Sequence, residues 1–289
     1  MVLPLEHNVP SAEAYLELLK ACLTRRIAPE KYKELREPSH LEHGSPLRRR
    51  LFWRGVLPPL RALFARYGLE LVRRVNGPGE VRELGQDWPA EAETMIGTRR
   101  LDNLHRCVCD VLRRGVPGDL IETGVWRGGA TIFMRGALKA YGDATRVVWA
   151  ADSFEGLPKP SEKFAADREA NYWKDSHWLA VSLEEVRENF RRYSLLDERV
   201  RFLKGWFKDT LPNAGIERLA VMRLDGDMYE STMDALVPLY PRLSSGGYCS
   251  IDDYWLPACR AAADDFRKRE NITEKLEKID WAGVFWQKA

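Results

Sequence analysis

LIETGVWRGG, residues 120–129, is the stretch around which the rest of this chain can be interpreted. The residues up to Glu122 predict a short buried strand that ends in a carboxylate. Gly124, Gly128 and Gly129 then allow a tight turn and a close approach of the backbone to a ligand. An apolar helical pattern follows at once, which gives a strand, a glycine-rich loop and a helix in sequence. An open α/β sheet binds a nucleotide-like cofactor at such a place.

This loop lacks the fingerprints of two common nucleotide sites. It does not match GxGxxG, and no GK[ST] lies nearby, so the sequence predicts neither a dinucleotide fold nor a P-loop. A glycine-rich turn can also be only a tight turn. The functional interpretation therefore depends on what the neighbouring strands carry.

Composition sets broad limits on the class of protein. The 289 residues are 45% hydrophobic, and 45 basic against 43 acidic residues give a net charge of +2, which offers no argument for nucleic acid. No apolar run reaches transmembrane length, and the first residues lack a signal-peptide pattern. The five cysteines are scattered and form no CxxC, as in reduced cytosolic proteins. We therefore expect a cytoplasmic protein with no nucleic-acid or membrane partner.

Two features mark the N-terminal part. Residues 11–27 predict an amphipathic helix, and residues 46–75 are rich in arginine, with Pro58–Pro59 dividing them into two helical pieces. A basic amphipathic segment can lie on a membrane surface or an RNA backbone. The simpler interpretation is that its apolar face packs on the main domain or on a second subunit of a homodimer. We assign residues 1–85 to an N-terminal helical extension and residues 86–289 to the main domain.

Strands and helices alternate through the main domain, which predicts a mostly parallel sheet with helices on both faces. The expected strands are 119–122, 146–151, 200–203, 219–224 and 248–251, the expected helices are 183–193, 231–240 and 260–270, and 273–279 with 284–287 form a closing hairpin. A long irregular insert, 154–180, interrupts this alternation. Its aromatic residues suggest a lid over a site.

Acidic residues follow three of the predicted strands. Asp152 ends the second strand, where an acid can accept hydrogen bonds from a ribose diol. Asp225 and Asp227 follow the fourth strand, and Asp252 and Asp253 follow the fifth. Crowded carboxylates repel unless a cation lies among them. Oxygen ligands and the absence of histidine from both segments favour Mg²⁺ over zinc.

With these motifs in place, the chain resembles the macrocin O-methyltransferase family, bacterial enzymes that methylate sugar hydroxyls on antibiotics and related natural products. The resemblance is dense over residues 84–254 and looser over the first helix, and the arginine-rich segment has no clear correspondence. The segments that carry it are YLELLKACLT (15–24), DWPAEAETMIGTRRLDNLHRCV (87–108), VPGDLIETGVWRGGATIFMRGALKAYGD (116–143), VWAADSFEGLPKP (148–160), SLLDERVRFLKGWFKDTLP (194–212), RLDGDMYESTMDALVPLYPRL (223–243) and GGYCSIDDY (246–254).

The resemblance implies a class I S-adenosylmethionine-dependent methyltransferase fold, Rossmann-like, with a seven-stranded, mostly parallel sheet whose last strand is antiparallel. It also implies a cofactor-binding set around the methionine, carboxylate and ribose of S-adenosylmethionine. That set is Thr94, Met95, Gly97, Glu122, Thr123, Gly124, Trp126, Asp152, Ser153 and Asp225. The metal ligands would be Asp225, Asp252 and Asp253, and Asp227 would be the general base.

The implied chemistry is methyl transfer to a hydroxyl. Mg²⁺ would lower the pKa of the acceptor hydroxyl, and Asp227 would take its proton as the oxygen attacks the methyl group. A free aspartate has a pKa of about 4, so the metal must carry most of the activation. Tyr229 is expected to support the start of a helix, and His177, in the insert, is left outside the catalytic set.

Two alternatives stay open at this point. A Mg²⁺-dependent methyltransferase of a catechol-like aromatic diol would use the same metal chemistry. A non-catalytic binding protein could keep the fold without turnover, although the glycine loop and all four acids are present. The sequence leaves open which acceptor and which hydroxyl are used.

Overall fold

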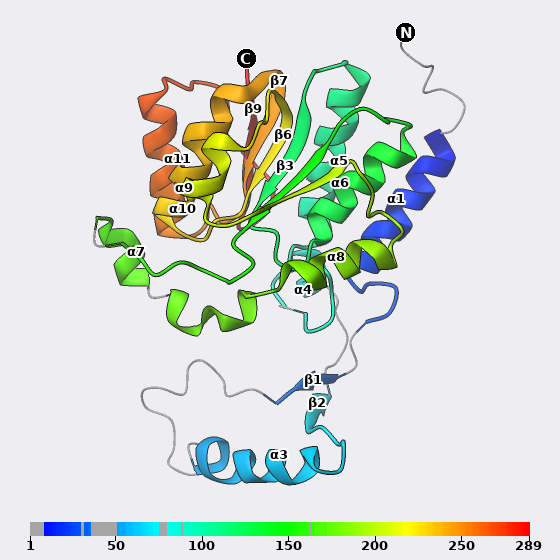
Figure 1. Cartoon of the computed structure of the whole chain (residues 1–289), viewed down its shortest axis with the longest axis vertical. Coiled ribbons are helices and arrows are strands. Elements are labelled where there is room, and N and C mark those ends of the chain that lie inside the picture. The colour runs from blue at the N-terminus through cyan, green and yellow to red at the C-terminus, as the bar shows by residue number, and fades with distance from the viewer. Residues whose placement is uncertain are drawn as a thin grey trace.

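The computed structural model describes residues 9–29, 32–35, 51–74, 80–87, 89–161, 163–170 and 172–289. Their centre is a seven-stranded sheet with the order β5-β4-β3-β6-β7-β9-β8 (Figure 1). The strands are β3 (Asp119–Thr123), β4 (Val148–Asp152), β5 (Val200–Lys204), β6 (Leu219–Leu224), β7 (Leu243–Ile251), β8 (Glu277–Lys278) and β9 (Val284–Gln287).

The direction of each strand follows the prediction. The five strands β3 to β7 pair in parallel, and β9, the last strand in the chain, runs antiparallel to both β7 and β8. All six residues of β6 are buried, as expected for a parallel strand that is covered on both faces. The predicted fold class and the closing hairpin are therefore confirmed.

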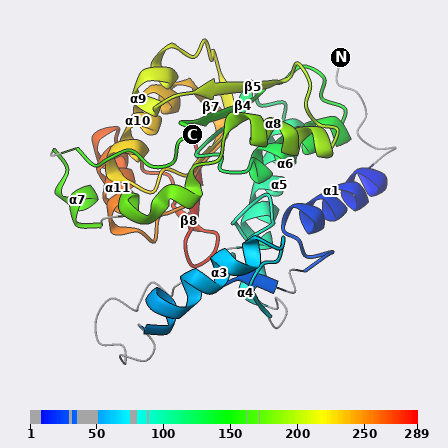
Figure 2. The ribbon, with the colours of Figure 1, turned by 60° about the horizontal axis from the view of Figure 1, so that its bottom comes forward.

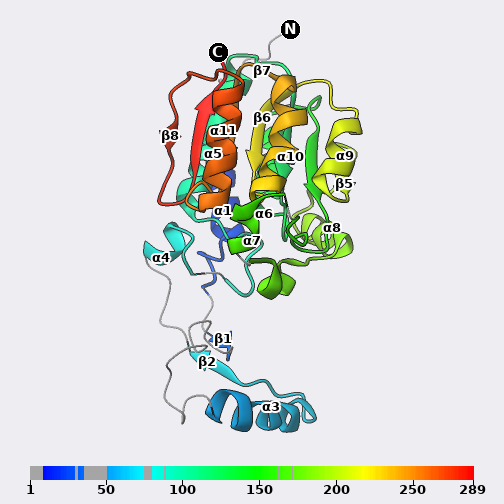
Figure 3. The ribbon, with the colours of Figure 1, turned by 90° about the vertical axis from the view of Figure 1, so that its left-hand side faces the viewer.

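Helices cover both faces of the sheet (Figure 3). One face packs on α5 (Thr98–Arg113), α6 (Gly129–Ala140) and α8 (Leu183–Arg192), and α1 (Val9–Leu23) packs on the outer side of α6; Leu16, Leu101, Phe133 and Phe190 lie in this core. The other face packs on α9 (Phe207–Thr210), α10 (Tyr229–Leu239) and α11 (Pro257–Arg269), with Leu236, Phe266 and Trp286 in its core. The two apolar layers fix the sheet, and so fix the loops at its carboxyl edge.

The N-terminal extension divides into two parts. Its first helix, α1, packs on α6 through Leu19, which lies so close to Gly136 that a Cβ there would be 2.5 Å from the leucine. Beyond it lie β1 (Tyr32–Glu34), the π-helical piece η3 (Phe52–Val56), α3 (Leu57–Ala65), β2 (Val72–Arg74) and α4 (Glu80–Glu83). Of these elements, β1, η3, α3 and β2 lie apart from the sheet (Figures 1 and 3).

The arginine-rich segment does not show the predicted division into two helical pieces, because η3 runs directly into α3 through Val56 and Leu57, both in helical conformation, and the proline pair is accommodated in the first turn of α3. Residues 46–50 and 75 of that segment lie outside the described residues. Its large apolar side chains are mostly exposed: Leu51, Phe52, Val56, Leu60, Leu63, Tyr67, Leu69 and Val72. The apolar face of these residues therefore does not pack on the main domain, and a second subunit, a membrane surface and an RNA backbone stay open among the alternatives named from the sequence.

The 154–180 insert is more regular than the sequence suggested. It contains α7 (Ala165–Ala170) and the 3₁₀ helix η4 (Tyr172–Leu179). It crosses the end of the sheet between β4 and α8 (Figure 2). Among the described residues, no helix has the length and apolar character needed to cross a membrane.

Candidate active site

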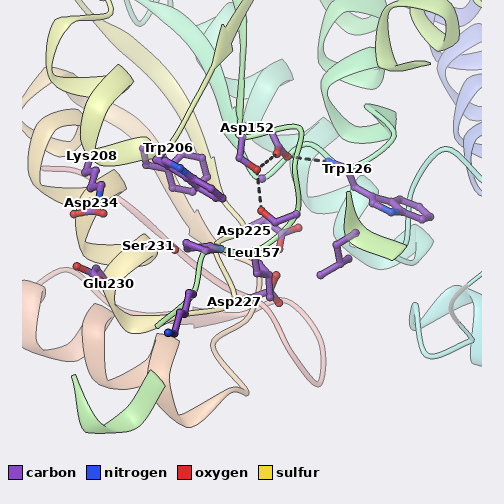
Figure 4. Close-up of a pocket in the computed structure, with 18 of the residues that line it drawn as sticks. Trp126, Asp152, Leu157, Trp206, Lys208, Asp225, Asp227, Glu230, Ser231 and Asp234 are labelled. Carbon is purple, nitrogen blue, oxygen red and sulfur yellow. Dashed lines mark hydrogen bonds between the residues drawn. The ribbon is translucent and has the colours of Figure 1, made fainter. Parts of the chain in front are cut away.

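A cavity of about 330 Å³ opens at the carboxyl ends of the central strands (Figure 4). The loops after β3, β4, β5 and β6 form its walls, and the 154–180 insert covers it. The lining residues are Met95, Gly124, Trp126, Asp152, Ser153, Gly156, Leu157, Pro158, Lys159, Ser161, Leu179, Trp206, Phe207, Lys208, Asp225, Gly226, Asp227, Glu230, Ser231 and Asp234. This is where a doubly wound sheet is expected to bind its ligand.

The glycine loop is shaped by close backbone packing. Gly124 has a φ of +81°, and a Cβ on it would lie 1.7 Å from the carbonyl oxygen of Asp225. Only glycine can therefore bring the loop after β3 against the loop after β6. The next turn holds Trp126 at a φ of +48°, with its indole Nε1 donating to the carbonyl oxygen of Trp178 at 3.3 Å. The loop thus contacts both the acidic loop and the insert.

Asp152 joins the second strand to this loop. Its Oδ2 accepts hydrogen bonds from the backbone N–H of Val125 at 2.7 Å and of Trp126 at 3.3 Å. Its Oδ1 accepts from the N–H of Phe154 at 2.8 Å. Burial raises the pKa of Asp152, and these backbone donors oppose that rise. Asp152 lines the cavity, as a ribose-binding acid should, and also fixes the walls around it.

Glu122 lies behind the cavity wall. Its buried carboxylate accepts from Arg223 and from the hydroxyl of Thr131. Burial raises its pKa to about 7, against the opposing effect of Arg223. The strand end therefore holds a carboxylate that orders the site from behind.

The expected cofactor residues fall into two groups. Those that line the cavity are Met95, Gly124, Trp126, Asp152, Ser153 and Asp225. Those that lie behind its walls are Thr94, Gly97, Glu122 and Thr123, all of them buried. In the first of these segments Thr94 packs on Gly129, at the start of α6, which leaves Met95 to face the cavity.

Three of the four predicted acids come together at one point. Ligand oxygens of Asp225, Asp227 and Asp253 all lie within 4.8 Å of one another. Asp253 Oδ2 is buried and finds no hydrogen-bond donor among the described residues. An oxygen-only cluster with a buried oxygen that lacks a donor has the composition of a site for a hard divalent cation.

The fourth acid, Asp252, is held by two buried arginines. Arg223 Nη2 lies 2.6 Å from its Oδ1, and Arg100 Nη1 contacts its Oδ2. Arg223 Nη2 also lies 3.0 Å from Asp225 Oδ2, and Arg100 Nε lies 3.0 Å from Asp280 Oδ2. These arginines are not among the site residues predicted from the sequence. One signal was available, since Arg223 stands inside the apolar strand LAVMRL.

The electrostatics of the cluster follow from this crowding. Burial, and then the charges of Asp225 and Asp252, raise the pKa of Asp227 to about 7. Burial and its carboxylate neighbours also raise the pKa of Asp253 well above its ordinary value. Asp227 has a φ of +57°, an unfavourable backbone conformation for an aspartate. The surrounding structure therefore stabilises an arrangement of acids that would not persist alone.

Tyr229, named in the sequence analysis, lies beside the cavity without lining it. Tyr229 is the first residue of α10, as expected, and its hydroxyl donates to Asp265 Oδ2 at 3.0 Å. His177 lies in η4, and its side chain is outside the described part of the structure. The wall after β5, where Trp206 and Phe207 face the cavity, is not among the features predicted from the sequence. The motif GWFKDTLP (205–212), which contains both aromatic residues, was the available signal.

A second group of potential metal ligands lies between α1 and α5. Glu13, His105 and Cys109 lie within 4.8 Å of one another. The hydroxyl of Tyr141 occupies their centre, at 2.5 Å from Glu13, 2.7 Å from His105 and 3.1 Å from Cys109. Hydrogen bonds therefore satisfy this group without an ion.

Comparison with known proteins gives consistent matches. Residues 12–288 match the sequence profile of the macrocin-O-methyltransferase (TylF) family. The chain is 59% identical over 207 residues to 8-demethyl-8-(2,3-dimethoxy-alpha-L-rhamnosyl)-tetracenomycin-C 4'-O-methyltransferase of Streptomyces olivaceus, which covers 71% of this chain and 79% of that protein. It is 56% identical over 211 residues to demethyldecarbamoylnovobiocin O-methyltransferase of Streptomyces niveus, and this match covers 72% of this chain and 80% of that protein. The solved structure of the O-methyltransferase NovP superposes with a TM-score of 0.80 at 45% identity, covering 96% of this chain and 99% of that one.

Proposed function

The chain belongs to the macrocin O-methyltransferase family, and we propose that it transfers the methyl group of S-adenosylmethionine to a sugar hydroxyl of a glycosylated natural product. The observation that carries this proposal is the acidic cluster beside the glycine loop in one covered cavity. Two relatives named for glycosylated antibiotics, tetracenomycin and novobiocin, support the acceptor class. The enzyme is accordingly an O-methyltransferase of antibiotic tailoring.

The cofactor occupies the part of the cavity between the loops after β3, β4 and β5. Gly124 permits close approach of the methionine portion, Asp152 faces the ribose, and the aromatic rings of Trp206 and Phe207 offer an apolar surface to the adenine. The hydroxyl that receives the methyl group then lies toward Asp225 and Asp227. Holding both reactants in one orientation beneath the insert supplies much of the catalytic effect.

The residues present fit Mg²⁺, because the cluster offers only carboxylate oxygens and leaves Asp253 Oδ2 without a donor. The family resemblance assigns Asp225, Asp252 and Asp253 as the ligands; of these, Asp225 and Asp253 lie in the cluster, and Asp252 lies against Arg100 and Arg223. Bound there, Mg²⁺ supplies Lewis-acid polarisation of the acceptor hydroxyl.

Asp227 is assigned as the base that takes the hydroxyl proton. Among the four acids, Asp225 and Asp227 line the cavity, and Asp225 is already paired with Arg223. Asp227 is therefore the acid best placed to accept a proton from the acceptor. In the competing assignment, Asp227 takes the place of Asp252 as a metal ligand. This assignment follows the geometry, because Asp252 is paired with arginines and Asp227 lies among the clustered oxygens.

We also propose that the enzyme is a cytoplasmic homodimer. All five cysteines are free, in keeping with a reducing compartment. The exposed apolar face of η3 and α3 offers a surface for a second copy of this chain. Deleting residues 46–75 should convert a dimer to a monodisperse monomer in light scattering. A full-length protein that is already monomeric would contradict the homodimer.

The experiment that tests the proposed function is a product analysis with labelled cofactor. The protein is incubated with methyl-deuterated S-adenosylmethionine, Mg²⁺ and the demethylated glycosides that the relatives' names specify, with a catechol as control acceptor. We expect labelled methyl on the sugar of at least one glycoside and none on the catechol. Methylation of the catechol alone would show that the acceptor is an aromatic diol and not a sugar.

A further inference from the structure

The 154–180 insert forms the roof of the cavity. Gly156, Leu157, Lys159, Ser161 and Leu179 line the cavity from above. The roof begins directly after Asp152 and ends at the start of α8. The insert therefore bounds one side of the cavity, and its position affects access to the site.

One side chain in the middle of the insert contacts the start of α10. Asp167, on α7, is only 2% exposed. Its Oδ1 accepts from the backbone N–H of Tyr229 at 2.6 Å, and its Oδ2 accepts from that of Glu230 at 3.0 Å. These are the first amides of α10, and Met228 at the N-cap provides no side-chain hydrogen bond of its own. A residue 62 positions away in the chain thus satisfies donors that a helix start leaves open.

The helix that Asp167 caps is part of the site. α10 begins two residues after Asp227, and its Glu230, Ser231 and Asp234 line the cavity. Ring contact strengthens the junction, because Phe164 and Tyr229 lie 4.7 Å apart at their ring centres. The buried carboxylate therefore joins the roof directly to the acidic loop and the adjoining wall.

We propose that Asp167 is a positioning residue, a latch that holds the insert closed over bound reactants by capping α10. The inference rests on the proposed function, since it takes the cavity under the insert as the place where the reactants bind. The far end of the roof is held separately by the hydrogen bond from Trp126 to the carbonyl of Trp178. Release of Asp167 therefore loosens α7, which also packs on α10 and α11, while the end of the insert stays attached.

The test compares Asp167→Ala and Asp167→Asn with a matched control, Ser182→Ala. Ser182 caps α8 by accepting from the N–H of Glu185 at 3.2 Å, at an exposed site outside the cavity. Wild type and the three variants are compared in two measurements. One is the hydrogen-exchange rate of residues 163–170 and 229–232, and the other is the dissociation rate of S-adenosylhomocysteine. We expect Asp167→Ala to speed both by about tenfold or more, and Ser182→Ala to leave both unchanged.

Asp167→Asn keeps one carbonyl oxygen that can accept one of the two N–H groups, so we expect an intermediate effect. This variant also preserves the test if Asp167→Ala does not fold. Exchange rates within twofold of wild type in the Asp167 variants would overturn the latch, as would an equal change in Ser182→Ala. If wild-type protein binds no S-adenosylhomocysteine, the proposed function fails, while the exchange rates still decide whether Asp167 holds the insert.

Discussion

Replacing Asp227 by Asn should raise the stability of the metal-free protein and lower its turnover, because the change removes both an unfavourable buried charge and the proposed proton acceptor. The ionised Asp227 carboxylate is disfavoured by burial and by Asp225 and Asp252, which raise its pKa from 3.8 to about 7. The folded state therefore binds more protons than the unfolded state between these values, and stability falls as pH rises through that window. In metal-free protein above about pH 7, the shift corresponds to a penalty of about 4 kcal/mol.

An asparagine at 227 keeps the shape of the side chain and removes its charge. We therefore expect metal-free Asp227→Asn protein to melt higher than wild type at pH 8, by about 8 °C, since each kcal/mol is worth about 2 °C or more in a protein of this size. Near pH 4 the difference should vanish, because the carboxyl of wild type is then protonated in the folded state. Thermal unfolding in the presence of a chelator at both pH values measures this directly.

The same variant should lose turnover. Loss of a general base typically costs a hundredfold or more in rate, and added Mg²⁺ should not restore it. S-adenosylmethionine should still bind, because the loops after β3 and β4 are intact. If Asp227→Asn melts at or below wild type, the strain at this residue is absent. If its rate returns with added Mg²⁺, Asp227 is a ligand and the base lies elsewhere.

Three further outcomes follow from the site. Asp253→Asn should weaken Mg²⁺ binding at least tenfold and regain part of its activity as Mg²⁺ is raised; a rate that ignores added Mg²⁺ would remove Asp253 from the ligand set. Gly124→Ala should abolish S-adenosylhomocysteine binding in calorimetry, because its Cβ would meet the Asp225 carbonyl; unchanged binding would contradict the proposed contact. Mg²⁺ affinity should rise from pH 6 to pH 8, with proton release that differs with buffer in calorimetry, because the raised pKa values of Asp227 and Asp253 leave protons for the cation to displace. An affinity independent of pH would show that the acids are already ionised.

The sheet could be predicted because its physical signals are local. Buried parallel strands are short apolar runs, and the glycine loop and strand-end acids mark where each run stops. The positions of Asp152, Asp225 and Asp227 at one cavity follow from strand direction alone, since the carboxyl ends of parallel strands meet at one edge. The parallel crossover rule then limits the possible orders of the strands.

The details inside the site depend on long-range pairing that local patterns do not contain. Asp252 turns toward Arg100, which is 152 positions away, so no spacing rule could separate it from Asp253. The helix in the insert that carries Asp167 is only six residues long, too short to show a period. The exposed apolar face of α3 reads in sequence like any amphipathic helix, because a pattern does not say what the face contacts.

The most direct test of the account is the release of S-adenosylhomocysteine by wild-type protein, measured together with the mass of the acceptor. With a demethylated glycoside and Mg²⁺ present, we expect one S-adenosylhomocysteine for each methyl group gained by the sugar, and loss of both signals when a chelator removes the metal. Product formation that continues undiminished in chelator-treated protein would contradict the role given to Asp225, Asp252 and Asp253.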